Sequence, residues 1–385
     1  MQPIYLDHAA STPMRPEAVA ALQPYLAEIY GNPSGSHRAS QLAKTAIEAA
    51  REQVAELVGA TPSEIVFTGG GSEGDNLAVK GAAWAAADRG LDGIVTTGIE
   101  HKAVLGAAHR LGREGRRVVE VPATTDGIVD LDRLADALDE RTAVVSVMLV
   151  NNEVGTVQPL VDVAALAAER APRAVVHTDA VQAPQWLDLR AATAVAQLVS
   201  LSGHKFGGPK GVGVLVVRDG VDLVPLIEGG GHEWGLRAGT QNVAGIVALA
   251  TALQVTDARR DDERTRIGAL RDRLERALLD SIGGAAVNGD PTRRVDGLLH
   301  ISFPGVEAET LLVALDQEGV CAASGSACSS GAIDPSHVLA AMGLERDRAL
   351  SAVRFSLGAA STADEIDAAI PIIVACVERL RVAAA

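Results

Sequence analysis

Cysteine and aromatic residues are scarce in this chain of 385 residues, and each scarcity excludes a class of protein. The three cysteines, Cys321, Cys328 and Cys376, form no CxxC pair and have no histidine at ligand spacing, which argues against a disulfide framework and a structural zinc site. Aromatic residues make up only 3% of the chain, so alanine, valine and leucine must fill the core. This composition is typical of a globular protein in a reducing compartment.

An excess of positive charge and long apolar runs are also missing. The net charge of −15 is spread along the chain, which argues against a protein that binds nucleic acid or membranes through charge. The N-terminus lacks the basic and apolar segments of a signal peptide. The longest uncharged run, residues 238–256, contains polar residues such as Gln241 and Asn242 and predicts a buried helix. We therefore expect a cytoplasmic protein that binds neither nucleic acid nor membranes.

Short apolar segments alternate with segments of helical periodicity over the first two thirds of the chain. The apolar, β-branched segments predict buried strands at residues 65–68, 94–97, 118–121, 144–150, 175–178, 198–201 and 212–217. Between several of them lie predicted helices at residues 38–58, 130–138 and 161–170. This alternation predicts an α/β fold with a mostly parallel sheet and helices on both of its faces.

The pattern changes after about Thr256 and predicts a second, smaller domain. A highly charged segment at residues 257–276 predicts a long helix that leaves the main domain. Strands at 298–303 and 352–357, helices at 307–318 and 362–381, and a loop of Gly, Ser and Ala follow in an α+β pattern. We therefore expect a large domain of residues 16–256 and a small domain of residues 1–15 and 257–385.

A glycine loop, Gly69-Gly70-Gly71-Ser72, directly follows the first predicted strand and opens a helix. Backbone N–H groups at such a point bind anions, and the Ser72 hydroxyl adds a further donor. On its own the loop fits equally well a tight turn in which Ser72 caps the helix. It matches neither the dinucleotide-binding fingerprint nor the P-loop.

Two charged residues, Asp179 and Lys205, follow apolar strands at the point where α/β sheets bind ligands. A buried carboxylate at Asp179 needs a partner, which a protonated pyridine nitrogen would supply; a helix cap is the alternative. Partial burial would lower the pKa of Lys205 and make its amine a nucleophile, whereas a surface lysine is the commoner case. Together with the glycine loop and a stacking ring at His101, they match the needs of pyridoxal 5′-phosphate (PLP).

Cys328 lies in a run of small residues, 323–331, which is unlike the apolar surroundings of a buried structural cysteine. Cys376, by contrast, lies in an apolar run. We expect the loop of residues 322–334 to be mobile, so that the Cys328 thiolate reaches first the cofactor and then a partner.

With these residues identified, the chain resembles the cysteine desulfurases of the NifS/IscS type, which are class-V-aminotransferase-like PLP enzymes of fold type I. The matching motifs include Tyr5-Leu6-Asp7, Glu100-His101-Lys102, Asn151-Asn152-Glu153, residues 202–211, Arg354-Phe355-Ser356 and Ser324-Gly325-Ser326-Ala327-Cys328. The last motif is the most discriminating. The glycine loop differs from the Ser-Gly-Ala-Thr that is usual in the family, and we expect only softer phosphate binding because Ser72 keeps the hydroxyl.

The resemblance implies a role for each candidate site residue. Lys205 would hold PLP, Asp179 and Gln182 would contact its ring nitrogen and ring oxygen, and His101 would stack on the ring and transfer protons. Its phosphate would be held by Gly71, Ser72, Ser202 and His204, and by Thr240 of the other subunit, which implies a homodimer. Asn152 would contact the cofactor and, with Arg354, the substrate carboxylate.

The same resemblance implies the reaction. The enzyme would convert L-cysteine to L-alanine, form a persulfide on Cys328, and pass the sulfur to an iron–sulfur scaffold or another sulfur-acceptor protein. Apart from transient binding of an iron–sulfur cluster by Cys328, no metal site is expected. Three alternatives stay open at this point: a selenocysteine lyase, another class-V aminotransferase or lyase, and a persulfide carrier without enzymatic activity.

Overall fold

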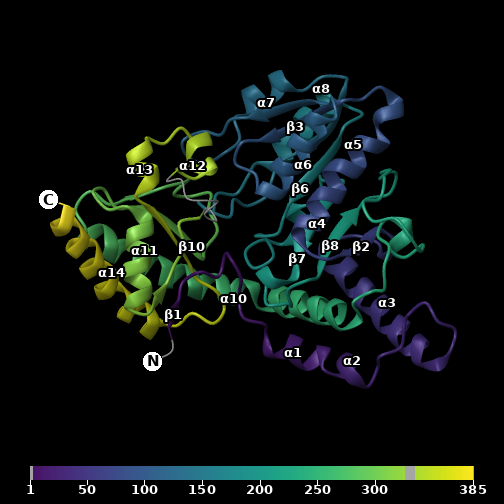
Figure 1. Cartoon of the computed structure of the whole chain (residues 1–385), viewed down its shortest axis with the longest axis horizontal. Coiled ribbons are helices and arrows are strands. Elements are labelled where there is room, and N and C mark those ends of the chain that lie inside the picture. The colour runs from purple at the N-terminus through teal and green to yellow at the C-terminus, as the bar shows by residue number, and fades with distance from the viewer. Residues whose placement is uncertain (1–2, 326–333, 385) are drawn as a thin grey trace.

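A seven-stranded sheet forms the centre of the larger part of the chain (Figure 1). The computed structural model describes residues 3–325 and 334–384. The strands are β2 (Ile65–Thr68), β3 (Gly93–Thr97), β4 (Arg117–Val121), β5 (Thr142–Ser146), β6 (Val175–Asp179), β7 (Leu198–Ser202) and β8 (Gly213–Val217), in the order β2-β8-β7-β6-β5-β3-β4. Only β8 runs antiparallel to its neighbours, so the mostly parallel sheet predicted from the sequence is confirmed.

Helices cover both faces of this sheet because successive strand residues point to opposite sides. On β5, Val145 packs into one core with α3 (Arg38–Val58), α7 (Leu131–Ala137), α8 (Leu160–Arg170) and the first half of α10 (Val243–Ser281). Its neighbour Val144 packs into a second core with α5 (Ala82–Ala85) and α6 (Lys102–Arg113) on the other face. The continuous apolar runs in the sequence therefore reflect strands that are buried on both sides.

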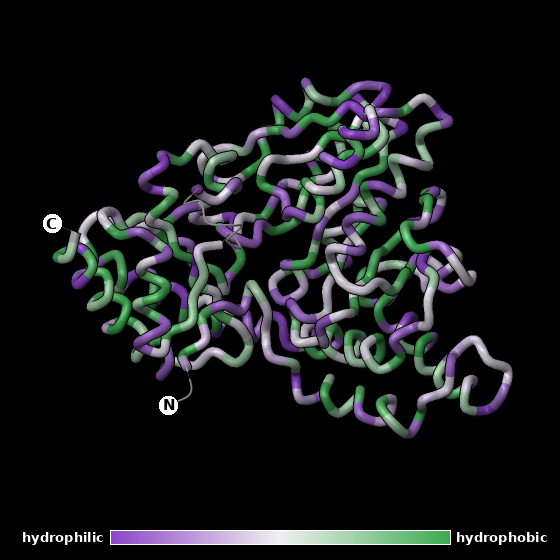
Figure 2. The backbone as a smooth tube through the Cα atoms, viewed as in Figure 1, coloured by the Kyte–Doolittle hydropathy of each residue, from purple (hydrophilic) through white to green (hydrophobic). Residues whose placement is uncertain are grey.

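The smaller part of the chain is built on a three-stranded antiparallel sheet. Its strands are β9 (Ala286–Val287), β10 (Leu298–Ser302) and β12 (Ala352–Ser356), and its helices are α11 (Ala308–Gln317), α12 (His337–Ala341), α13 (Arg346–Leu350) and α14 (Ala363–Ala384). Figure 2 shows hydrophobic stretches along α14, which packs against α11. A parallel pair of short strands, β1 (Ile4–Tyr5) and β11 (Val320–Cys321), attaches the N-terminal segment to this part.

The remaining elements are short. They are the helices α1 (Pro16–Leu22), α2 (Pro24–Ala27), α4 (Gly71–Asn76) and α9 (Leu189–Ala192), a π-helix at Leu77–Gly81, and 3-10 turns at Pro62–Glu64, Ala87–Arg89, Gly203–Lys205 and Glu233–Gly235. Among the described residues, no helix combines the length and the apolar character that a membrane span requires.

Helix α10 differs from the expectation of two separate helices that meet near Thr256. It continues without a break for 39 residues and runs along both parts of the chain (Figure 1). It packs on α3 and α1 and also on α14 of the smaller part. No proline separates the apolar half from the charged half, and the helix continues through Thr256 and Asp257, so the change in composition marks a change of surroundings rather than a helix end.

Candidate active site

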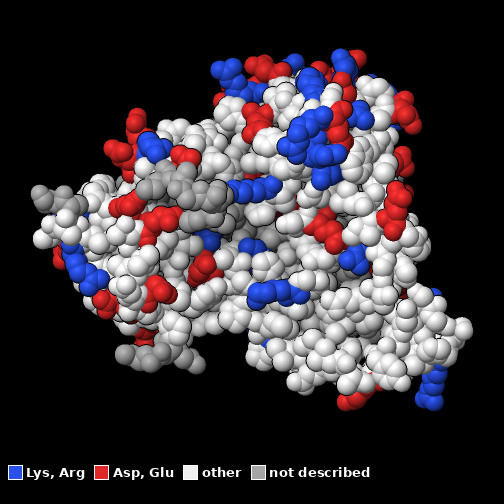
Figure 3. Space-filling view, viewed as in Figure 1, with Lys and Arg blue, Asp and Glu red and all other residues white. Residues whose placement is uncertain are grey.

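A cavity of about 830 Å³ lies at the carboxyl ends of the parallel strands, beside β12 of the smaller part. In Figure 3 the surface is hollowed between the two parts, and Lys and Arg side chains lie in and around this hollow. Ten of the residues singled out from the sequence line the cavity: Gly71, Ser72, His101, Asn152, Asp179, Gln182, Ser202, His204, Lys205 and Arg354. Thr240 is exposed and lies outside the cavity lining of its own chain, and Cys328 lies outside the described residues.

The glycine loop joins β2 to α4 on the wall of the cavity. Gly70 has φ = 146°, a backbone conformation that side-chain-bearing residues rarely adopt. A Cβ atom on Gly71 would lie 2.8 Å from Cγ2 of Val181, so only glycine allows this close approach. The N–H groups of the first turn of α4 are thereby free to face an anion in the cavity.

Glu73 supports this loop, although it was not among the candidate site residues. Its Oε2 accepts a 2.8 Å hydrogen bond from the backbone N–H of Gly69, and its Oε1 lies 3.0 Å from Nε of Arg237. The ion pair connects the loop to the segment that carries Thr240.

Lys205 lies in the 3-10 turn after β7, and its ammonium group contacts backbone oxygens rather than an acid. Nζ donates to the carbonyl oxygens of Ala9, at 2.5 Å, and of Ala10, at 3.0 Å. Burial lowers the pKa of Lys205 to about 8, and the positive charge of Arg354 acts in the same direction. No carboxylate among the described residues forms an ion pair with Lys205. Because no such pair stabilises the ammonium form, the amine loses its proton more readily than an ordinary lysine.

The N-terminal segment supplies part of the cavity wall. From the sequence, this segment was expected only to belong to the smaller domain. The carbonyl of Ala9 accepts a second hydrogen bond, at 2.7 Å, from Nε2 of Gln182. The Ser11 hydroxyl lies 3.3 Å from Nδ1 of His204. The acceptor on Ala9 is a backbone carbonyl, which every residue type offers, so the sequence carries no signal of this contact.

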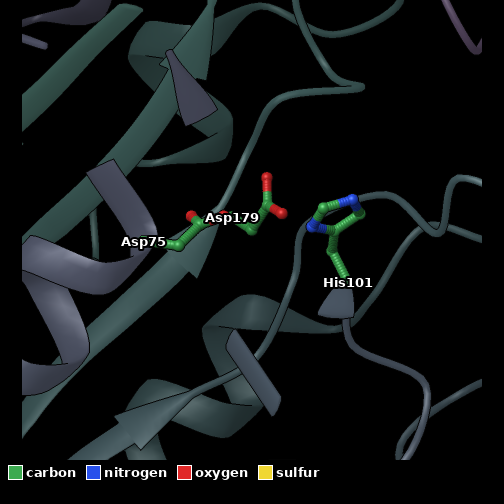
Figure 4. Close-up of side chains that lie close together, drawn as sticks. All are labelled: Asp75, His101 and Asp179. Atoms are coloured by element: carbon green, nitrogen blue, oxygen red, sulfur yellow. The ribbon is translucent and has the colours of Figure 1, made fainter. Parts of the chain in front are cut away.

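Asp179 ends β6 inside the cavity and faces the ring of His101 (Figure 4). Its Oδ1 accepts a 2.9 Å hydrogen bond from the N–H of Val181. Burial raises the pKa of Asp179 above its ordinary value, and this effect is opposed by His101 and by the Val181 hydrogen bond. Among residues 3–325 and 334–384, no cationic side chain forms an ion pair with Asp179, so its charge calls for a positively charged ligand group.

His101 caps the N-terminus of α6. Its Nδ1 accepts a hydrogen bond of 3.2 Å from the N–H of Ala103, which fixes the orientation of the ring. Desolvation lowers the pKa of His101 below its ordinary value, so the ring is neutral at neutral pH. A neutral, fixed ring on this side of the cavity suits stacking on a flat ligand.

Arg354 lies on β12 and closes the cavity from the smaller part. Nη1 donates to the carbonyl oxygen of Asn152 at 2.8 Å, and Nη2 donates to Oδ1 of Asp7 at 2.7 Å. Its Nε is buried and has no hydrogen-bond partner among the described residues, which leaves a donor for an anionic group. Asn152 thus contacts Arg354 through its backbone. Asp7 was not selected from the sequence, although it stands in the motif Tyr5-Leu6-Asp7.

These groups fit PLP. One cavity is lined by three groups that PLP requires. The glycine loop suits the phosphate, and the buried carboxylate of Asp179, which has no cationic partner among the described residues, suits the ring nitrogen. The amine of Lys205, with its lowered pKa, suits the aldehyde. Asp75, His101 and Asp179 also offer atoms within 4.8 Å of one another (Figure 4). A protonated ring nitrogen of PLP beside Asp179 would balance the negative charge of that carboxylate.

Comparison with known proteins agrees with this fit. The family described as aminotransferase class-V matches residues 4–369. A cysteine desulfurase of Trichormus azollae is 44% identical over 382 residues, which cover 99% of this chain and 94% of that protein. A solved NifS-like protein has a TM-score of 0.92 at 35% identity and covers 98% of this chain and 100% of its own. A structure of "SspA in complex with cysteine" has a TM-score of 0.80 at 34% identity, with coverage of 92% and 98%.

Proposed function

The chain belongs to the class-V aminotransferase family and, within it, to the cysteine desulfurases, and from this premise we propose that it moves the sulfur of L-cysteine onto its own Cys328. The enzyme depends on PLP and releases L-alanine. The observation that carries the proposal is the convergence of Lys205, Asp179 and Arg354 on one cavity. The first two residues suit the cofactor, and the third suits the carboxylate of an amino acid.

When it is bound, PLP supplies an aldehyde that captures an amine and a ring that withdraws electrons from the Cα atom of an amino acid. In this proposal its phosphate is held by Gly71, Ser72, Ser202 and His204, its ring by Asp179, Gln182, Asn152 and His101, and its aldehyde by Lys205. Each of these side chains or its backbone lines the cavity.

Lys205 and Arg354 act on the substrate. Arg354 binds the carboxylate through its free Nε–H and so orients the Cα–H bond. Because the pKa of Lys205 is about 8, a useful fraction of its Nζ is neutral at neutral pH and takes the Cα proton. Asp179 stays ionised and so favours the protonated form of the PLP ring nitrogen.

Sulfur transfer requires a nucleophile, and Cys328 is our candidate. Its thiolate attacks the substrate sulfur, the bond between Cβ and that sulfur breaks, and a proton replaces sulfur on the substrate carbon. L-Cysteine and the Cys328 thiol thereby become L-alanine and a Cys328 persulfide, with no external oxidant or reductant. An acceptor thiol then takes the outer sulfur.

Incubation of the purified protein with L-cysteine tests this reaction. We expect L-alanine and protein-bound sulfane sulfur in a ratio of one to one in the first turnover, measured by amino-acid analysis and by cyanolysis. L-Serine should give no alanine because its oxygen is not a target for a thiolate. Formation of pyruvate and free sulfide in place of alanine would instead identify a lyase.

We also propose that the enzyme is a cytoplasmic homodimer whose partner is an iron–sulfur scaffold or another sulfur-acceptor protein. Large exposed apolar residues gather on α1, α2, α3 and the segment between α2 and α3; Leu26 on α2 is 66% exposed and Tyr30 in that segment is 79% exposed. A 2.8 Å contact between Ser34 and His232 links this surface to the segment before Thr240. A second copy is the occupant we propose for it.

The division into domains is part of the same proposal. The PLP-binding domain comprises residues 16–256, and residues 1–15 and 257–385 form the smaller domain. The latter carries Cys328 in the loop of about residues 322–334, which lies partly outside the described residues.

A mixed dimer tests whether Thr240 serves the active site of the partner. Thr240→Ala alone should weaken PLP binding about tenfold, since a hydrogen bond to a charged group contributes about 1.5–3 kcal/mol. In a heterodimer of Thr240→Ala with Lys205→Ala, the one site that retains Lys205 receives the intact Thr240. Its PLP affinity, measured by titration of the heterodimer, should therefore equal the wild-type affinity. If the affinity stays at the weakened Thr240→Ala value, Thr240 acts within its own chain. If Thr240→Ala itself binds PLP like the wild type, Thr240 does not contribute to binding.

A further inference from the structure

Asp75 is a buried carboxyl group that the proposed reaction leaves without a role. It lies on α4, just after the glycine loop, and is 1% exposed. Its Oδ1 is buried and has no hydrogen-bond partner in the part of the chain that the structure describes. Figure 4 shows Asp75 beside Asp179, and these two carboxyl groups and the ring of His101 offer atoms within 4.8 Å of one another.

The nearest ring to Asp75 provides no positive charge. His177, on β6, places Nε2 at 3.7 Å from Oδ1 of Asp75. Its ring is fully buried between the hydroxyl groups of Ser146, at 2.8 Å, and Ser200, at 3.0 Å. Desolvation lowers the pKa of His177 to about 3, so the ring is neutral.

The other nearby acid does not supply a counter-charge either. Glu100 is fully buried, and its Oε1 accepts hydrogen bonds from Thr97 and from the N–H of Met148. Burial raises the pKa of Glu100 to about 8. Asp75 therefore faces two carboxyl groups and a neutral imidazole.

Two carboxylates that share a buried site cannot both ionise at neutral pH, so one proton must remain on the pair. Two features stabilise the anion of Asp179: the N–H of Val181 donates to it at 2.9 Å, and the positive charge of Lys205 lowers its pKa. Asp75 has one oxygen without a partner among residues 3–325 and 334–384, and a hydrogen bond from Ser200 only partly offsets its burial. Burial and the charge of Asp179 both raise the pKa of Asp75 well above its ordinary value.

We propose that Asp75 is a positioning residue that stays protonated, so that Asp179 is the single anion of the pair. This inference rests on the proposed function, in which Asp179 faces the ring nitrogen of PLP. The neutral carboxyl group of Asp75 packs behind Asp179 and does not compete with it for the positive charge of the ring nitrogen. The site then presents one negative charge at this point instead of two.

Infrared spectroscopy tests the protonation state directly. The PLP-loaded enzyme, with its aspartates labelled with the heavy carbon isotope, should show at pH 7 the carbonyl band of a protonated aspartic acid. The label separates this band from that of Glu100. The band should be lost in Asp75→Asn and kept in Asp179→Asn and in the surface variant Asp126→Asn. Absence of the band in the wild type, or its survival in Asp75→Asn, would overturn the proposal.

A stability measurement on the same preparations gives a second, independent test. A carboxyl group whose folded-state pKa is raised keeps a proton that the unfolded chain loses above about pH 4, so it destabilises the fold as pH rises. The unfolding constant of the wild type, divided by that of Asp75→Asn, should rise about tenfold per pH unit between pH 5 and 7. A ratio that stays constant would show that Asp75 is ionised. Neither test depends on turnover, so a failure of the proposed reaction is recognised separately by the absence of alanine.

Discussion

Replacement of Lys205 by alanine is expected to abolish both the covalent attachment of PLP and turnover. The amine is the only group that we assign to the aldehyde of the cofactor, and it also takes the Cα proton. Loss of a general base alone costs about 100- to 10,000-fold in rate, so activity should fall below detection in a routine assay. Absorbance spectra and alanine release measure the two losses.

The matched controls use the other lysines of the cavity. Lys102 and Lys210 also line it, and their alanine variants should keep the borohydride-reducible link to PLP. Lys205→Arg keeps the positive charge but offers no free amine, so it should fail as completely as Lys205→Ala. Peptide mapping after borohydride reduction locates the link. A pyridoxyl group on Lys102 or Lys210 of the wild type would refute the assignment of Lys205.

Replacement of Cys328 by serine is expected to separate cofactor binding from sulfur transfer. The PLP-binding residues that we assign do not include Cys328, so the variant should bind PLP with wild-type affinity. A hydroxyl group is a much weaker nucleophile towards sulfur at neutral pH, so persulfide formation should be lost and alanine release should fall at least about 100-fold. Intact-mass analysis and amino-acid analysis measure these two products.

The other two cysteines are the natural controls. Cys321 is half-buried on β11, and Cys376 is buried at 2% exposure on α14. Burial raises the pKa of both thiols, which disfavours the reactive thiolate. Cys321→Ser and Cys376→Ser should therefore form persulfide at the wild-type rate. Sulfur mapped mainly to Cys321, or wild-type alanine release by Cys328→Ser, would contradict the mechanism.

The sheet was well predicted because its strands carry a strong local signal. The run at residues 65–68 coincides with β2, and the runs for β3, β4, β6, β7 and β8 agree to within one residue at either end. For β5 the apolar run continues to Val150, whereas the strand ends at Ser146. Beyond that point Val147 and Leu149 still donate to the carbonyls of His177 and Asp179 on β6, and the alternate residues Met148 and Val150 line the cavity.

The side chains that line the cavity were largely predicted from the sequence. Its backbone acceptors and the pairing of two buried carboxyl groups were not predicted. Asp179 and Lys205 follow strands that are easy to recognise, so their positions could be derived from the sequence. The carbonyls of Ala9 and Ala10 have no distinctive residue type, and Asp75 is an ordinary helix residue until its neighbour Asp179 is known. Such contacts depend on long-range packing and could not be derived from local pattern.

The contacts of the N-terminal segment also determine when the active site is completed during synthesis. Ala9 and Lys205 are separated by 196 residues in the chain, and Asp7 and Arg354 by 347. Ala9 therefore waits for its partner until synthesis has passed Lys205, and Asp7 waits until synthesis has passed Arg354. A nascent chain that already contains Lys205 still lacks Arg354, and so it cannot yet orient an amino acid over the cofactor. Activity begins only when the C-terminal residues join the first ones.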